Sequence, residues 1–259
     1  MRGLAGKVLV VAGGGTGEAG PGNGAATAIR LADEGAAVAV GDVDRDAAAA
    51  TVELIRARGG RAGAFECDVA NADSVQSMVS ETVAHFGAVD GLHVNAADLS
   101  PEVLGVDSET DLLTIPLPVW QRTLDVNLTG FVLCARVVIP HLLERGGGGI
   151  TNTLSDAIHA GERVRVAYAT SKSALVAVTH HIASRWGRDG VRCNSISPGI
   201  IARTDRMAAE LSGTGRREPR APRAGRPDDV AALAAYLLSD DGAWVNGQVW
   251  SVNGGRFLS

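Results

Sequence analysis

The chain has 259 residues, 46% of them hydrophobic and 20% charged, which is ordinary for a globular protein of one or two domains. Its net charge of −5 argues against a nucleic-acid-binding surface, because such surfaces usually carry an excess of basic residues. The three cysteines are odd in number and lie far apart without metal-ligand spacing, so we expect no metal site and a reducing, cytoplasmic location.

Short apolar runs alternate with longer helix-like segments along the chain, and no run approaches the length of a membrane span. Apolar strands separated by helices are typical of a parallel sheet covered on both faces. We therefore expect one α/β domain over 1–259, doubly wound around a seven-stranded parallel sheet. Strands are expected at 7–12, 36–42, 61–69, 89–96, 148–155, 190–198 and 247–254, and helices at 25–35, 45–60, 72–87, 119–146 and 168–187.

A glycine-rich segment, GGGTGEAGPGNG (13–24), joins the first strand to the first helix. Asn23 and Gly24 stand where the P-loop motif GxxxxGK[ST] needs Lys and Ser/Thr, which disfavours nucleotide hydrolysis. A GxGxxG spacing begins at Gly15, but in so glycine-rich a run it is partly accidental. The loop precedes a helix whose first amides can meet a pyrophosphate, and a flexible turn is the alternative.

Asp42 ends the second expected strand, eighteen residues after Gly24. A carboxylate there can accept hydrogen bonds from an adenosine ribose and would repel a 2′-phosphate, which favours NAD over NADP. A turn residue at a strand end is the alternative, because Asp44 and Asp46 are also acidic.

Two long connections, 98–118 and 203–227, interrupt the alternation of strands and helices. Both follow strands, so we expect them at the sheet edge where ligands bind, near the substrate site. A surface insertion that never touches substrate is the alternative for 98–118. The arginines of the second connection either attract an anionic substrate or carrier protein or belong to a solvated lid: Arg203, Arg206, Arg216, Arg217, Arg220, Arg223 and Arg226.

Tyr168 and Lys172 lie four residues apart at the start of an expected helix, so they share a face. An ammonium near a phenol stabilises the phenolate, which predicts a Tyr168 pKa lowered toward neutrality. Ser155 ends the preceding strand and can meet Tyr168 in space. A solvated helix face is the alternative interpretation of the pair.

Together these segments resemble the short-chain dehydrogenase/reductase superfamily over nearly the whole chain. YATSK (168–172) matches its YxxxK signature, and Ser155 lies thirteen residues before the tyrosine, the usual interval for the catalytic serine. LDVNLTG (124–130) matches the segment that carries the catalytic asparagine. The resemblance implies a Rossmann-type fold and a catalytic tetrad of Asn127, Ser155, Tyr168 and Lys172.

The same resemblance implies where the cofactor binds. CDV (67–69) matches the strand end that contacts adenine, VNAA (94–97) corresponds to NNAG, and SPG (197–199) matches the turn beside nicotinamide. Residues 225–255 look like the superfamily's last helix, turn and strand. The implied cofactor is NAD, held by Gly13, Gly22, Asn23, Gly24, Asp42, Asp68, Val69, Asn95, Ala96, Tyr168, Lys172, Pro198, Gly199, Ile201 and Thr204.

The chain departs from the superfamily pattern in several places. The glycine loop is five residues longer than TGxxxGxG, and Ala12 replaces the threonine. Thr204 lies one residue later than the threonine that usually binds the carboxamide, so the backbone at Ile201 is a comparable candidate. The connection from Ala97 to Asn127 is about eight residues longer than usual, which we interpret as an added loop near the substrate entrance.

The resemblance implies reversible hydride transfer between NAD and a secondary alcohol/ketone pair, the activity of an alcohol dehydrogenase or ketoreductase. Tyr168 would act as general acid/base, Ser155 would bond the reacting oxygen, Lys172 would hold the nicotinamide ribose, and Asn127 would hold a water linking Lys172 to solvent. Two alternatives stay open. One uses NAD for epimerisation or dehydration, and the other is a non-catalytic dinucleotide-sensing regulator.

The resemblance also suggests the substrate pocket and the assembly. Near the expected pocket lie Asp98, Asp156, His159 and Met207, and we expect a small-molecule substrate. The superfamily typically dimerises through the helices expected at 119–146 and 168–187, and its last strand often completes a tetramer. We therefore expect a bacterial, cytoplasmic homotetramer with no nucleic-acid or membrane partner.

Overall fold

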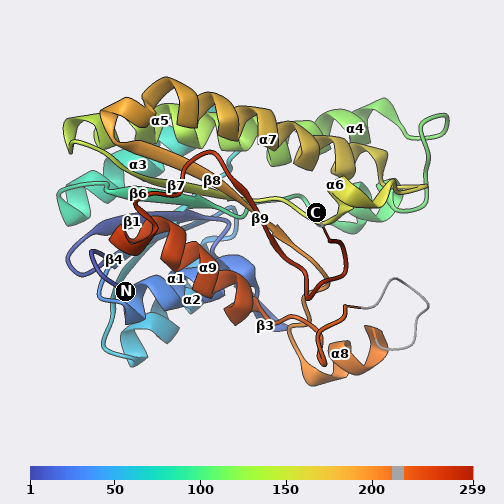
Figure 1. The fold of residues 1–259 in the computed structure, drawn as a ribbon, viewed down its shortest axis with the longest axis horizontal. Helices are drawn as coiled ribbons and strands as arrows, with labels where there is room; N and C mark the ends of the chain where they lie inside the picture. The colour runs from blue at the N-terminus through green and yellow to red at the C-terminus, as the bar shows by residue number, and fades with distance from the viewer. Residues whose placement is uncertain (212–218, 259) are drawn as a thin grey trace.

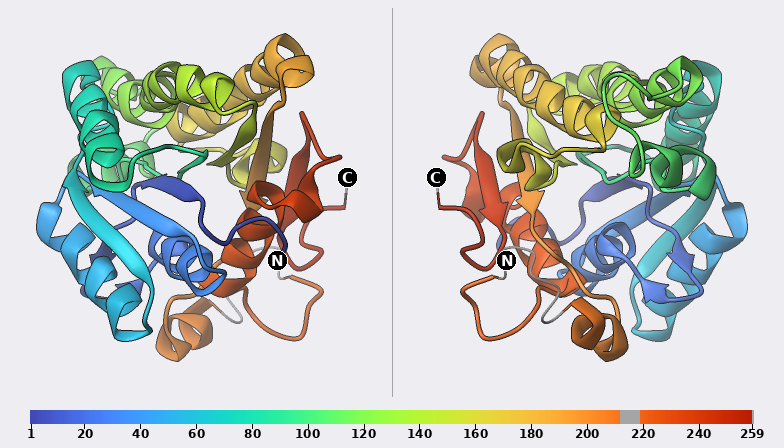
Figure 2. Two further views of the ribbon diagram at one scale, coloured as in Figure 1. Left: turned by 90° about the vertical axis from the view of Figure 1, so that its left-hand side faces the viewer. Right: turned by 90° about the vertical axis from the view of Figure 1, so that its right-hand side faces the viewer.

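The computed structural model describes residues 1–211 and 219–258, and its centre is a seven-stranded, fully parallel sheet (Figures 1 and 2). The strand order is β5-β4-β1-β6-β7-β8-β9, so the chain runs outward from β1 in one direction and then in the other. This confirms the predicted sheet and creates a switch point between β1 and β6, where such folds bind ligands. The strands are β1 (Val8–Ala12), β4 (Ala37–Asp42), β5 (Arg61–Glu66), β6 (Gly91–Val94), β7 (Gly148–Thr153), β8 (Val191–Pro198) and β9 (Val249–Val252).

Helices cover both faces of the sheet, as the doubly wound fold requires (Figure 1). Alternate residues of β1 point into two cores: Val10 and Ala12 into one, Leu9 and Val11 into the other. Each fully buried aliphatic side chain contributes roughly 1.5–3 kcal/mol, so both faces stabilise the sheet. One layer contains α3 (Ala72–Phe86), α5 (Gly130–Glu144) and α7 (Val166–Trp186), and the other α1 (Asn23–Asp33), α2 (Arg45–Ala57) and α9 (Pro227–Leu238).

The helix expected over 119–146 is divided in the structure. α4 (Leu117–Leu124) continues through a π-helical turn, η2 (Asp125–Thr129), into α5. The wider π turn holds Asn127, a feature that apolar periodicity does not reveal. By length and composition, Leu117–Glu144 could cross a membrane, contrary to our expectation for the sequence. However, it packs against α3, β6 and β7, as the core helix of a globular protein does.

The five extra residues of the glycine segment form a small antiparallel ribbon, β2 (Thr16–Gly17) and β3 (Gly20–Pro21). The Thr16 and Thr51 hydroxyl oxygens lie 2.8 Å apart, which ties the ribbon to α2. α1 begins directly after the ribbon, with Gly22 as its N-cap. The added length therefore lies in the loop and leaves the strand–helix geometry on either side intact.

The two long connections contain structure of their own at the carboxyl edge of the sheet (Figure 1). The first includes a π-helical turn, η1 (Pro101–Gly105), and the second includes α8 (Asp205–Leu211). Neither element was expected, because proline and short length hide them from periodicity. The remaining short elements are α6 (Ala157–Ala160), η3 (Gly187–Asp189) and η4 (Asp240–Gly242).

Candidate active site

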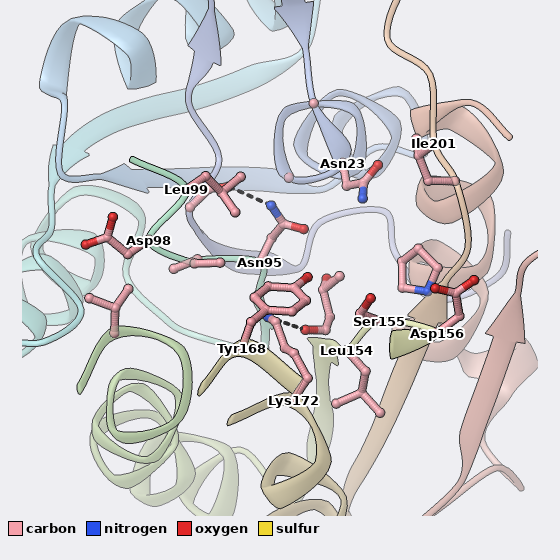
Figure 3. Close-up of a pocket in the computed structure, with 18 of the residues that line it drawn as sticks. Asn23, Asn95, Asp98, Leu99, Leu154, Ser155, Asp156, Tyr168, Lys172 and Ile201 are labelled. Atoms are coloured by element: carbon pink, nitrogen blue, oxygen red, sulfur yellow. Dashed lines mark hydrogen bonds between the residues drawn. The ribbon is translucent and has the colours of Figure 1, made fainter. Parts of the chain in front are cut away.

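The carboxyl ends of the strands surround a cavity of about 1360 Å³ (Figure 3). In this view Asn23 and Ile201 lie on one side, and Tyr168, Ser155 and Lys172 on the other. Among the residues that the sequence predicted for the site, the lining set is Gly13, Gly22, Asn23, Gly24, Asp42, Asp68, Val69, Asn95, Ala96, Asp98, Ser155, Asp156, His159, Tyr168, Lys172, Pro198, Gly199, Ile201 and Met207. Asn127 and Thr204 do not line it.

Two glycines bring β1 and α1 into direct backbone contact beneath the cavity. A Cβ on Gly24 would lie 1.9 Å from the carbonyl oxygen of Gly13, and one on Gly13 would lie 2.6 Å from Ala96 N. Gly13 also has φ +76°, which L side chains rarely adopt. The Asn95 side chain donates to the Gly13 carbonyl oxygen at 3.4 Å and fastens this turn to β6. These contacts form a cradle of bare backbone at the start of α1.

The N-terminus of α1 has no side-chain cap, unlike those of α2 and α3. The Asp44 carboxylate caps α2, and the Asn71 side chain caps α3 by accepting two backbone hydrogen bonds. Gly22 makes no such contact, and the first turn of α1 has no acidic residue. The open amides of α1 line the cavity, so a pyrophosphate fits this position by charge and by shape.

The carboxylate of Asp42 lies at the opposite end of the cradle. One oxygen accepts a hydrogen bond from Gly15 N at 2.8 Å, and the other from Asp44 N at 3.2 Å. Gly15 lines the cavity too, although we had not assigned it to the site. The carboxylate keeps further lone pairs that can accept from ribose hydroxyls. A dinucleotide therefore fits the residues between Asp42 and the start of α1.

Asp68 and Val69 form the cavity wall beyond β5. The Asp68 carboxylate accepts a hydrogen bond from Ala70 N at 2.9 Å, and the backbone N of Asp68 donates to the Ser74 hydroxyl at 3.0 Å. Val69 is buried against Gly130, whose missing side chain leaves room for it. These contacts hold the turn after β5 at the edge of the cavity.

Thr204 differs from the other residues predicted to hold the cofactor, because it does not line the cavity. Thr204 lines a separate groove of about 690 Å³ between α1, α8 and α9, and its hydroxyl accepts from Met207 N at 3.1 Å. It therefore caps α8 and points away from the cavity. Ile201 lines the cavity and is held by a bridge to Gly225.

Tyr168, Lys172 and Ser155 meet at the end of β7. Tyr168 lies in the first turn of α7, and Ser155 is close enough to its phenol to lower the pKa of that group. Lys172 lies one turn later, and its Nζ donates to the Thr153 carbonyl oxygen at 2.8 Å (Figure 3). The Lys172 Nζ is 5.8 Å from the centre of the Tyr168 ring.

The pKa of Tyr168 is shifted in the direction opposite to our expectation. Burial of the phenol raises its pKa, which outweighs the lowering by the Ser155 hydrogen bond and the Arg165 guanidinium. The Lys172 ammonium donates to the Thr153 carbonyl oxygen, and burial lowers its own pKa to about 8. Arg165, whose guanidinium carbon lies 5.8 Å from the ring centre, is a cation that favours the phenolate.

Burial lowers the pKa of Lys172 from 10.5 to about 8, which predicts a pH-dependent cost in stability. The charged ammonium destabilises the fold below pH 8, and this cost falls as pH rises toward 10.5, where the unfolded chain also loses its proton. Without cofactor, we expect the free energy of unfolding of Lys172→Met, measured relative to that of the wild type, to be higher at neutral pH than at alkaline pH. Chemical denaturation should show this difference fall by about 2 kcal/mol between roughly pH 7 and 9.5.

Lys7→Met is the matched control for the loss of a lysine charge, since Lys7 lies at the surface and pairs with Asp240 at 3.0 Å. A stability difference between Lys172→Met and the wild type that stays constant with pH would contradict a buried, charged Lys172.

Asn127 is buried behind the cavity, with both side-chain polar atoms engaged. Its Oδ1 accepts from Asp98 N at 3.0 Å, and its Nδ2 donates to the Ser171 hydroxyl at 3.1 Å. The side-chain amide keeps one acceptor and one donor position, so the expected water-holding role stays a prediction. Asn127 also joins the 98–118 connection to the residue before Lys172.

The far side of the cavity is lined by three arginine–carboxylate pairs. Asp98 pairs with Arg122 at 3.0 Å, and Glu162 pairs with Arg165 through two hydrogen bonds. Burial raises the pKa of Asp98, but hydrogen bonds from Ser100 and Arg122 outweigh it and hold that pKa below its usual value. These pairs make polar the side of the cavity where we expect the substrate to bind.

The third pair joins Asp156 to Arg256 at 2.7 Å, and both side chains are largely buried. Burial raises the pKa of Asp156, which the Arg256 partner opposes. Phe257 follows Arg256 and lies 6.3 Å, ring to ring, from His159, so the C-terminal segment forms a wall of the cavity. Sequence analysis missed the pairing arginines, because no local pattern connects positions so far apart in the chain.

The arginines of the second connection are divided between the cavity and the surface. Arg203 lines the cavity, whereas Arg223 and Arg226 pair with carboxylates of α9 and α8. Arg216 and Arg217 lie outside the described residues. Of the two expectations for these arginines, attraction of an anion is open to Arg203, because it lines the cavity.

Comparison with known proteins agrees with this fold. Residues 19–256 match a family model described as enoyl-(acyl carrier protein) reductase. The chain is 40% identical to a probable short-chain type dehydrogenase/reductase of Bradyrhizobium diazoefficiens over 96% of this chain and 87% of that protein. It is 36% identical to D-threitol dehydrogenase of Mycolicibacterium smegmatis over 97% of this chain and 93% of that protein.

A solved structure shows the same similarity in three dimensions. 7α-Hydroxysteroid dehydrogenase, complexed with NADH and 7-oxoglycochenodeoxycholic acid, superposes with a TM-score of 0.86 and 29% identity, covering 99% of this chain and 97% of that one. The relatives match over nearly their whole length, and the predicted resemblance is confirmed. The chain therefore belongs to the short-chain dehydrogenase/reductase superfamily of oxidoreductases.

Proposed function

We propose that this protein is an NAD(H)-dependent oxidoreductase that interconverts a secondary alcohol and a ketone. The observation that carries the proposal is that Tyr168 and Ser155 line the same cavity as the glycine cradle and Asp42. A proton-transfer group and a dinucleotide cradle in one cavity support hydride-transfer chemistry. The names of the D-threitol and 7α-hydroxysteroid dehydrogenases support an alcohol as the substrate class.

Each polar group at the end of β7 has a distinct role in this proposal. Bound nicotinamide supplies the acceptor for a hydride from the carbinol carbon. Tyr168 takes the hydroxyl proton, and Ser155 donates a hydrogen bond to the same oxygen. Arg165 stabilises the phenolate, because its positive charge lowers the Tyr168 pKa. Lys172 holds the ribose next to nicotinamide, and Asn127 positions the neighbouring backbone.

Cofactor reduction with a panel of secondary alcohols tests the function. We expect NADH to accumulate, measured by its absorbance, with at least one member of a panel containing 2-butanol, cyclohexanol, D-threitol and a hydroxysteroid. Epimerisation or dehydration would convert substrate without net NADH, and a dinucleotide-sensing regulator would bind NADH and turn over nothing. Either result would replace the proposal by the corresponding alternative.

The preference for NAD over NADP is proposed to depend on the Asp42 carboxylate. Like charges placed together cost several kcal/mol, so a carboxylate beside the adenosine ribose disfavours a 2′-phosphate. Asp42→Asn keeps the size and the acceptor for Gly15 N but removes the charge. We expect the ratio of the NADPH to the NADH dissociation constant to fall by about ten-fold or more, measured by fluorescence titration.

The matched control is Asp44→Asn, which removes a neighbouring charge that does not line the cavity and keeps an oxygen for the α2 cap. An equal change in that variant would attribute the preference to overall charge rather than to Asp42.

We further propose that 1–259 acts as one catalytic domain in a cytoplasmic homotetramer. The edge strand β9 supports the assembly, because Trp250 on it is 39% exposed and nearby Trp244 is fully exposed. Light scattering on the eluted protein would measure the number of subunits.

A further inference from the structure

The buried carboxylate of Asp107 lies against the start of α7, sixty residues later in the chain. One carboxylate oxygen accepts a hydrogen bond from Ala167 N at 3.2 Å, and the other from Tyr168 N at 2.9 Å. The carbonyl oxygen of Asp107 accepts from Arg165 N at 2.8 Å. One residue of a remote connection thus binds three backbone N–H groups at the start of the helix that carries Tyr168.

α7 has no cap from its own segment. Its N-cap residue, Arg165, makes no side-chain capping bond and has φ 63° and ψ 40°, the left-handed region. A non-glycine residue in that backbone conformation costs roughly 1–2 kcal/mol, which contacts with the surrounding structure must offset. The Asp107 carboxylate supplies the missing acceptors, and its charge is favourable at the positive end of a helix. Asp107 therefore replaces the local cap and holds Arg165 in its backbone conformation.

The segment around Asp107 is itself fixed in place. It follows the turn η1, whose Val103 is buried, and the Ser108 backbone N donates to the Leu104 carbonyl oxygen at 2.9 Å. The Asp107 side chain is 0% exposed, and adjacent Ser108 lines the cavity. The connection is thus a support of the active-site helix and reaches the cavity as well.

We propose that Asp107 is a positioning residue for Tyr168, which rests on the proposed role of Tyr168 as general acid/base. By holding the first turn of α7, Asp107 orients the phenol toward Ser155 and places the Arg165 guanidinium beside it. Proton transfer depends steeply on such geometry, since a displacement of about 1 Å can cost about 100-fold in rate.

The test compares Asp107→Ala with a matched variant of the same connection, Asp111→Ala. The Asp111 carboxylate also accepts two backbone hydrogen bonds, from Leu113 N at 3.0 Å and Thr114 N at 3.1 Å, but at an exposed turn. We expect Asp107→Ala to raise amide hydrogen exchange at Ala167 and Tyr168 by about ten-fold, because a lost cap lets the helix end open. Asp111→Ala should leave exchange there unchanged.

The chain has two tyrosines, so tyrosine labelled with ¹³C at Cζ provides a direct probe of the phenol by NMR. We expect Asp107→Ala to shift the resonance of Tyr168 and to leave that of Tyr236 in place. On the most active alcohol of the panel, kcat should fall by about 100-fold, with KM and the NADH dissociation constant kept within about two-fold. This separates positioning from general loss of the fold.

Wild-type exchange and a wild-type Tyr168 resonance in Asp107→Ala would overturn the proposal, as would an equal effect of Asp111→Ala. If Asp107→Ala does not fold, the same NMR measurement on Asp107→Asn tests the proposal, because the asparagine keeps one acceptor oxygen for the backbone of α7. A partly shifted Tyr168 resonance supports the proposal, and an unshifted one overturns it. The NMR experiment uses no substrate, so it decides the role of Asp107 even if the wild type oxidises none of the alcohols.

Discussion

Tyr168→Phe is expected to lower turnover by about 10³-fold while leaving the NADH dissociation constant within about two-fold of the wild type. The substitution removes the phenolic oxygen and keeps the ring, which packs in the first turn of α7. Proton transfer by a positioned side chain accounts for roughly 10²–10⁴ in rate, so the loss should appear in kcat. Initial rates of NADH formation and fluorescence titration of NADH measure the two effects separately.

Tyr236→Phe is the matched control, because Tyr236 is the second tyrosine of the chain and lies in α9, away from the cavity lining. Equal losses in the two variants would point to a general effect of removing a phenol. Undiminished turnover in Tyr168→Phe would remove Tyr168 from the mechanism. Loss of NADH binding in Tyr168→Phe would instead indicate that Tyr168 acts mainly as a cofactor ligand.

Gly24→Ala is expected to weaken NADH binding by about 100-fold or more and to destabilise the protein by several kcal/mol. The new Cβ would lie 1.9 Å from the Gly13 carbonyl oxygen and 3.0 Å from its carbonyl carbon. Both are backbone atoms of a turn held to β4 and β6, so no flexible side chain can move to relieve the overlap. β1 and α1 must separate, which opens the cradle proposed to hold the pyrophosphate.

Gly17→Ala provides the control within the same loop. A Cβ there meets nothing within 4 Å, and Gly17 does not line the cavity. We expect NADH affinity and thermal stability close to those of the wild type. Tight NADH binding in Gly24→Ala would contradict the cradle, and weak binding in Gly17→Ala would show that the β2–β3 ribbon itself contacts the cofactor.

Features that depend on neighbouring residues were predictable from the sequence. Apolar runs such as VLVVA at β1 predicted the strands, because a strand buried on both faces must be apolar along its length. The position of Asp42 at the end of the second expected strand predicted that it would lie with the glycine loop at the ligand-binding edge, and both line one cavity. The Tyr168–Lys172 spacing likewise placed both residues on the same side of α7.

Features that depend on distant residues were not predictable in the same way. The pairing of Asp156 with Arg256 joins residues one hundred positions apart, and the Asp107 carboxylate binds Ala167 N and Tyr168 N across sixty. The pKa of Tyr168 belongs to this group, since burial decides its direction. A spacing of four residues shows which groups are near, but not how much water they retain.

The sequence alone determined the parallel doubly wound sheet, the superfamily and most of the residues around the cavity, because each follows from local periodicity or a short motif. The tertiary structure decided what surrounds the proposed acid/base. Arg165 favours the phenolate, and Asp107 binds the first turn of the helix that carries Tyr168. These assignments required the fold, because burial and long-range hydrogen bonds form only when segments far apart in the chain pack together.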